Sequence, residues 1–167
     1  MTAGEIDVTL VQPRFEGAAL VAHVAGEIMI QRPVEEVFDF VADERNEPRY
    51  NRRMVLAEKV SPGAIGLGAR FRAELETMGQ TMPMNVEFTG YDRPRRLASV
   101  TRSTIMTTDG ALSFEQIAGG TLVHWSWDVR PHGLLRPMSP LVSWLGRRQE
   151  REIWGNLKRL LERGDVA

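Results

Sequence analysis

Residues 54–131 alternate between apolar and polar side chains in one short stretch after another, and this alternation constrains the fold more than any other feature of the chain. In "ARFRAELET" (69–77) and "TMPMNVEFTGY" (81–91) the apolar residues fall at every second position, which is the period of a half-buried strand. Turn residues in "SPGAIGLG", "YDRPRR" and "AGG" separate such stretches. Strands with so few residues between them predict an antiparallel meander.

Upstream of the meander, the sequence predicts one more strand and a short helix. "LVAHVAGEIMI" (20–30) alternates as a half-buried strand does, and Pro33 has the fixed φ that suits the first position of a helix. "DERNEPRYN" (43–51) is polar and contains a proline, which predicts a loop or a second short helix. Between them, apolar residues recur at helical spacing at Val34, Val37, Phe38 and Val41.

A long C-terminal helix is predicted after Pro131 from two apolar patches. On a straight helix these patches lie about 140° apart. This displacement predicts either a kink near Gly146 or a first half that packs against something other than the sheet. The first patch holds Leu141, Trp144 and Leu145, and the second holds Ile153, Leu157, Leu160 and Leu161.

Composition excludes several classes of protein. The 167 residues include no cysteine, so disulfides, thiolate nucleophiles and cysteine-bound metal centres are excluded. A net charge of −1 provides no field toward nucleic acid or anionic lipid, and no apolar run approaches the roughly 20 residues of a membrane span. The N-terminal residues lack the apolar core of a signal peptide. We expect a cytoplasmic monomer or weak homodimer with no nucleic-acid partner and no stable membrane insertion. The chain length predicts one domain (20–167), preceded by an arm or extra strand (1–19).

Three stretches of the chain carry a family resemblance: "EIMIQRPVEEVFDFVAD", "VSPGAIGLGARFRAE" and "FEQIAGGTLVHWSWDV". The order of elements and these motifs, over about residues 24–163, resemble the SRPBCC superfamily of START, Bet v 1, polyketide cyclase and lipid-transport-like proteins. Tyr50 departs from the family, which often has a tryptophan there. The resemblance implies an α+β helix-grip fold, in which a curved antiparallel sheet of about seven strands wraps around a long C-terminal helix, with two short helices after the first strand. It also implies an apolar cavity for a small hydrophobic ligand, such as a lipid or a polyketide.

The stretch "LVHWSWDV" (122–129) places a histidine and an aspartate beside two tryptophans. Strand alternation puts His124 and Asp128 on the outer face, roughly 13 Å apart, so they cannot share a proton. No nucleophile elbow or dinucleotide-binding glycine motif occurs, and the histidines lack the spacing of metal ligands. We therefore expect no metal and no cofactor.

Residues on the inner faces of the predicted strands are the candidate ligand-binding residues, although side chains in such positions also form ordinary core. On the C-terminal helix, Gln149 continues the first apolar patch and is a candidate to anchor a ligand's polar group. The strand candidates are Phe71, Leu75, Met84, Val86, Phe88, Leu112, Phe114, Trp125 and Trp127.

Three functions are compatible with these residues. The first is binding or transport of a small hydrophobic ligand. The second, which the resemblance implies, is a polyketide aromatase/cyclase; it requires inward-facing titratable groups, for which Arg148 and Glu152 are the candidates and Asp109 and Arg102 come after them. The same helical residues are also compatible with a solvated turn. The third is a protein-interaction module that uses the apolar segment 134–145.

Overall fold

A computed structural model describes residues 14–16, 19–77, 79–132 and 139–164, with side chains from residue 21 on and without those of 139–147. Eight strands, two α-helices and one 3₁₀ helix follow each other in these ranges. In chain order they are β1 (Arg14–Glu16), β2 (Ala19–Ile30), α1 (Val34–Ala42), the 3₁₀ helix η1 (Glu44–Arg49), β3 (Met54–Lys59), β4 (Arg70–Thr77), β5 (Gln80–Asp92), β6 (Arg96–Ser103), β7 (Met106–Ile117), β8 (Gly120–Pro131) and α2 (Ser139–Arg163).

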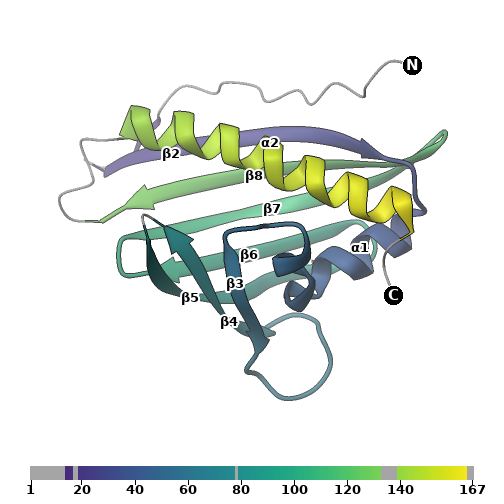
Figure 1. The fold of residues 1–167 in the computed structure, drawn as a ribbon, viewed down its shortest axis with the longest axis horizontal. Coiled ribbons are helices and arrows are strands. Elements are labelled where there is room, and N and C mark those ends of the chain that lie inside the picture. The colour runs from purple at the N-terminus through teal and green to yellow at the C-terminus, as the bar shows by residue number, and fades with distance from the viewer. Residues whose placement is uncertain (1–13, 17–18, 78, 133–138, 165–167) are drawn as a thin grey trace.

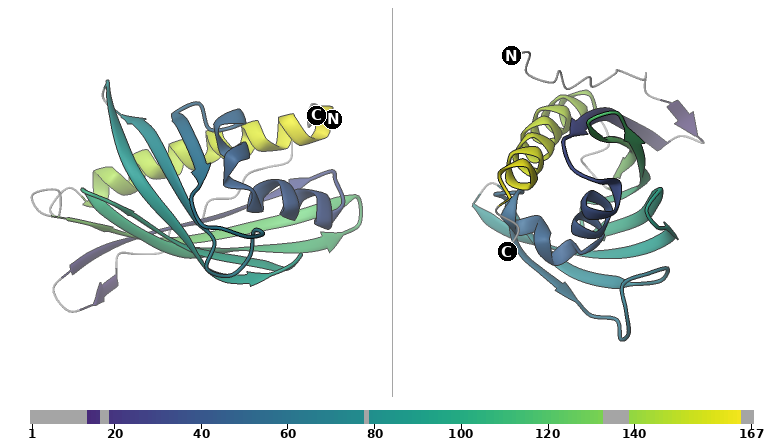
Figure 2. Two further views of the ribbon diagram at one scale, coloured as in Figure 1. Left: turned by 90° about the horizontal axis from the view of Figure 1, so that it is seen from below. Right: turned by 90° about the vertical axis from the view of Figure 1, so that its right-hand side faces the viewer.

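All strands join one antiparallel sheet in the order β1-β2-β8-β7-β6-β5-β4-β3. From β3 to β8 each strand pairs with the next in sequence, as a meander requires, and β2 then closes against β8. The sheet curves strongly, and α2 crosses its concave side with α1 and η1 at one end (Figures 1 and 2). The helix-grip fold that the family resemblance implies is therefore confirmed.

The two short helices begin where local chemistry predicts. Pro33 precedes α1, and Glu35 and Glu36 occupy its first turn, where the helix dipole favours negative charge. Its apolar stripe, which includes Val37 and Phe38, is buried. The Asp43 side chain accepts a hydrogen bond from the Arg45 amide and caps η1, so the polar 43–51 segment forms the second short helix.

The hydrophobic core fills the space between the concave face of the sheet and the helices. Phe38 of α1 meets the ring of Phe114 edge-on at a centroid distance of 5.1 Å, and Phe71 meets Phe88 at 5.3 Å. From α2, Leu157 and Leu161 are fully buried in the same cluster. Each such side chain contributes roughly 1.5–3 kcal/mol of burial free energy, and together they fix α2 against the sheet.

At the N-terminal side, Arg14–Glu16 pairs with the start of β2. At the other end, α2 is a single helix that runs through Gly146. The first apolar patch and the apolar segment 134–145 fall on residues or side chains outside the described part of the chain. No helix in the described ranges is long and apolar enough to cross a membrane.

Candidate functional site

Two tryptophans meet between the sheet and α2. The indole of Trp125, on the inner face of β8, stacks on the indole of Trp154 from α2, with centroids 4.9 Å apart and an angle of 12° between the planes. Strand alternation points Trp125 inward, and its side chain is 1% exposed. The stacked pair joins the middle of the sheet to the middle of α2.

Glu150 lies one turn before Trp154 on the same face of α2 and accepts a hydrogen bond from the Trp154 indole, with Nε1 and Oε2 2.7 Å apart. Burial raises the pKa of Glu150 to about 7. This value is the net result, because the negative charge of Glu47 also raises the pKa, whereas hydrogen bonds from Trp154 and Trp127 lower it. Glu150 therefore changes its protonation state near neutral pH.

Two more carboxyl groups reach the same region from η1. Glu44 and Glu47 are hydrogen-bonded to each other, and burial is the main cause that raises the pKa of each. The negative charge of Glu47 and the shared hydrogen bond raise the pKa of Glu44 further, so Glu44 carries the proton of the pair. Asn51 donates its amide hydrogen to Glu47 Oε1 at 2.7 Å and holds that carboxylate in place.

Tyr50 connects the three acids. Its side chain is buried, and burial raises the pKa of its phenol well above the ordinary value, with the charges of Glu47, Glu44 and Glu150 adding to the effect. Asn156 of α2 donates a hydrogen bond to the Tyr50 carbonyl at 2.9 Å and fixes η1 to the helix. We call Glu44, Glu47, Tyr50, Trp125, Trp127, Glu150 and Trp154 the acid–aromatic cluster.

The acid–aromatic cluster contains carboxyl groups without a cationic partner and a buried donor without an acceptor, among the residues that the structure describes. Within the described residues, no lysine or arginine forms an ion pair with Glu44, Glu47 or Glu150. The indole N–H of Trp125 is buried and has no hydrogen-bond partner among the same residues, although buried donors are nearly always paired. No group of three or more acids and histidines in the described chain is arranged to hold a metal ion.

A small cleft lies beside the acid–aromatic cluster, between α2 and the residues that lead from η1 into β3. Its volume is about 30 Å³, room for little more than a water molecule. Arg53 spans it by donating from Nη1 to Gln149 Oε1 at 2.8 Å, and the same guanidinium also donates to the Glu76 carbonyl. The lining residues are Asn51, Arg52, Arg53, Gln149, Glu152, Ile153 and Asn156.

The strand residues expected to line a pocket do face the interior. Leu75, Met84 and Trp127 are partly exposed, whereas the others are buried. Their contact with a ligand stays a prediction, because the same side chains also pack as core. The buried ones are Phe71, Val86, Phe88, Leu112, Phe114 and Trp125.

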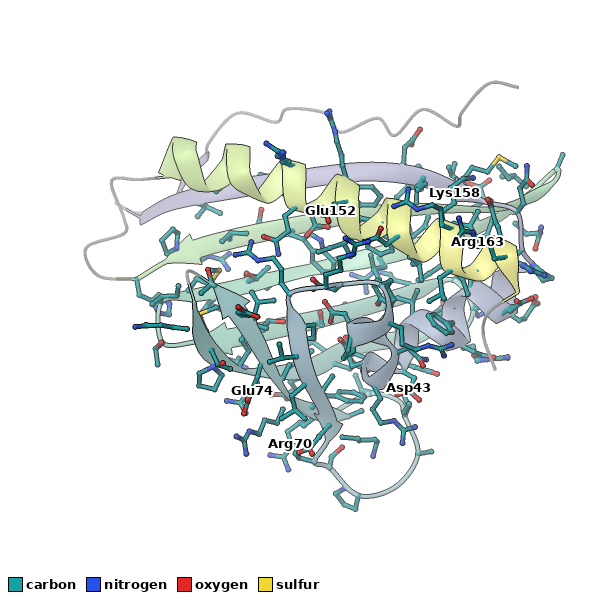
Figure 3. The ribbon with its side chains drawn as sticks, viewed as in Figure 1. Asp43, Arg70, Glu74, Glu152, Lys158 and Arg163 are labelled. Atoms are coloured by element: carbon teal, nitrogen blue, oxygen red, sulfur yellow. The ribbon has the colours of Figure 1, made fainter. Side chains whose placement is uncertain are left out.

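On α2, the two titratable candidates do not face the interior, whereas Gln149 is partly buried and lines the cleft together with Glu152. Arg148 and Glu152 are exposed, and Glu152 is labelled on α2 in Figure 3. Glu150 turns inward instead because it lies on the stripe of Trp154, Leu157 and Leu161, at a spacing of four, seven and eleven residues. The continuation of the second apolar patch toward the N-terminus, rather than that of the first, was the signal that could have identified it.

The outer face of the sheet holds the remaining candidates. His124 of β8 pairs with Glu27 of β2 at 3.0 Å, and Asp128 of β8 pairs with His23 of β2 at 2.7 Å. His124 and Asp128 therefore have different partners, as their expected separation requires. Asp109 pairs with Arg130, and Arg102 lies 3.6 Å from Glu87. None of these pairs contacts the acid–aromatic cluster in the described structure.

The family model described as polyketide cyclase / dehydrase and lipid transport matches residues 21–162. The chain belongs to this family, whose members bind small hydrophobic molecules. A comparison with curated proteins found no match.

Solved structures share the fold at low sequence identity. A protein from Thermus thermophilus superposes with a TM-score of 0.71 at 19% identity, over 82% of this chain and 94% of that one. The Zhui aromatase/cyclase from a Streptomyces species gives 0.68 at 14% identity, over 84% and 96%. A START superfamily protein from Mycobacterium smegmatis gives 0.66 at 16%, over 87% and 97%. At these identities the likeness concerns the fold.

Proposed function

We propose that the protein binds or carries a small hydrophobic ligand between the concave face of the sheet and α2, with the acid–aromatic cluster at the polar end of the site. One observation supports this function above all: Glu150, Glu47 and Glu44 are brought together beside the stacked tryptophans at a cost in desolvation. Apolar side chains at these positions would avoid this desolvation free energy and would be favoured if stability were the only requirement. Affinity would come mainly from apolar burial, about 25 cal/mol per Å².

Access to this site requires movement. The cleft of about 30 Å³ is far smaller than a lipid or polyketide, so α2 and the 51–53 segment must separate. The Arg53–Gln149 hydrogen bond closes this gap from the outside. We also propose a cytoplasmic location, because a chain without cysteine is compatible with a reducing compartment.

The direct test is mass spectrometry of the material that organic solvent extracts from protein purified under native conditions. A stoichiometric hydrophobic compound that raises the melting temperature of the stripped protein when added back would support the proposal. Protein that carries no such compound, and whose melting temperature no apolar probe shifts, would refute it.

The second candidate function is an enzyme of the polyketide aromatase/cyclase type, and the pKa of Glu150 favours it. A carboxyl group with a pKa of about 7 is suited to move protons near neutral pH. Turnover should then be lost in Glu150→Gln while ligand binding persists. If Arg148 and Glu152 move the protons instead, turnover should be lost in Arg148→Ala and Glu152→Ala and kept in Glu150→Gln. The three variants therefore distinguish between the two assignments of the catalytic groups.

A further inference from the structure

The acid–aromatic cluster has a composition that distinguishes between kinds of ligand headgroup. Its acids come from two elements, η1 and α2, and none has a cationic partner among the described residues. A ligand carboxylate or phosphate placed beside Glu47 and Glu150 would meet like charge in a poorly solvated region. A neutral headgroup would leave the buried charge uncompensated.

The aromatic side chains of the acid–aromatic cluster also favour a positively charged group. Trp125 and Trp154 stack on each other, Trp127 hydrogen-bonds Glu150, and the charge of Glu150 acts on the Tyr50 phenol, so these rings lie near the carboxyl group. Indole and phenol faces attract cations, most strongly when the cation has lost its water. Carboxylates and aromatic faces together therefore favour an organic ammonium group.

The buried N–H of Trp125 is an independent indication of a missing partner. Trp125 points from β8 into the space between the sheet and α2, against the same Trp154 that hydrogen-bonds Glu150. Its Nε1 has no acceptor among the described residues, and a buried unpaired donor costs roughly 1–3 kcal/mol. An oxygen atom on the ligand close to the ammonium would satisfy it.

We infer that the ligand of this site is a hydrophobic molecule with a protonated amine head and a neighbouring oxygen acceptor, whose ammonium is paired by Glu150 and Glu47 and whose oxygen accepts from Trp125. This inference rests on the proposed function, because the apolar part of the molecule would occupy the interior between the sheet and α2. Glu44, Glu47 and Glu150 are partly exposed, and the cleft is lined by Asn51, which hydrogen-bonds Glu47, and by Gln149, the neighbour of Glu150.

Calorimetric titration with three probes of equal chain length tests the inference: octylammonium, octan-1-ol and octanoate, near neutral pH. Octylammonium should bind at least about tenfold more tightly than octan-1-ol, and octanoate should bind most weakly. In Glu150→Gln the preference for octylammonium over octan-1-ol should shrink to about threefold or less. Glu115→Gln removes the same charge from the exposed outer face of β7, away from the cleft, and should leave the preference unchanged.

The outcomes separate the two proposals. If octan-1-ol or octanoate binds as well as octylammonium, the amine inference is wrong while the hydrophobic site stands. If Glu115→Gln reduces the preference as much as Glu150→Gln, the effect is a long-range charge effect and the assignment to the acid–aromatic cluster is wrong. If none of the three probes binds, the proposed function fails as well. Glu47→Gln provides a second test of the pairing should Glu150→Gln perturb Trp154.

Discussion

Replacing Glu150 by glutamine should make the folded protein more stable at alkaline pH. In the folded state the pKa of Glu150 is about 7, against an ordinary value of 4.5. The folded protein therefore holds this proton more tightly than the unfolded chain does, and stability is greatest below about pH 4.5 and falls as the pH rises toward 7. Glutamine stays neutral, so it avoids this loss.

The magnitude follows from the same two values. A rise from 4.5 to about 7 is about two and a half pKa units, and each unit is worth about 1.4 kcal/mol, which gives about 3 kcal/mol above pH 8. Because the side chain is partly exposed, this figure is an upper limit. The glutamine carbonyl can still accept the hydrogen bond from Trp154 Nε1, so little should be lost in exchange.

Urea unfolding at about pH 5 and about pH 8.5 measures the effect. Wild type should lose up to about 3 kcal/mol more than Glu150→Gln between the two pH values, while Glu152→Gln should follow wild type. Glu44 and Glu47 are present in both proteins, so the difference between the curves reports Glu150 together with its charge interaction with Glu47. Parallel curves for wild type and Glu150→Gln would show that the carboxyl group is not desolvated.

Three further predictions concern the framework of the site. Trp154→Ala should cost about 3–5 kcal/mol in urea unfolding, because it removes a buried indole and its stack, and a cost under 1 kcal/mol would contradict the packing. Gly110→Ala should cost at least about 1–3 kcal/mol, since a Cβ there would meet the Ser126 carbonyl and lie 2.8 Å from the Trp127 ring, whereas Gly66→Ala, with open space around it, should be nearly neutral in the same assay. Arg53→Ala should speed dissociation of a bound apolar probe in stopped-flow measurements with little effect on the melting temperature, and an unchanged rate would mean that the probe leaves elsewhere.

The sheet could be predicted from sequence because its signals are local. Strand period predicted strands at 69–77 and 81–91, each within one residue of the observed ends of β4 and β5. The inward face of Trp125 and Trp127 followed from alternation alone. These properties depend on neighbours in sequence, so one chain is enough to reveal them.

The acid–aromatic cluster could not be predicted in the same way, because it depends on contacts between distant elements. The spacing of Glu150 from Leu157 and Leu161 could have placed it on the buried face of α2, but no sequence signal places it beside Glu47 and Tyr50 of a distant element. Glu44 and Glu47 look like ordinary acids of a polar loop. Only the packing of η1 against α2 reduces the contact of their carboxyl groups with water. Extending the first apolar patch along a straight helix pointed to Glu152 instead, because the two patches of α2 lie on different faces.

The distribution of the polar groups over the fold has a consequence for how proteins of this kind change over evolutionary time. The sheet is held by backbone hydrogen bonds, whereas the carboxyl groups of the site are side chains of η1 and α2, which take no part in the strand ladders. Substitutions at positions 44, 47 and 150 can therefore alter the chemistry at the polar end of the site without disturbing strand pairing. If the site binds a ligand as proposed, such a division would let a common scaffold change its ligands, and positions 44, 47 and 150 would be the place to begin redesigning specificity.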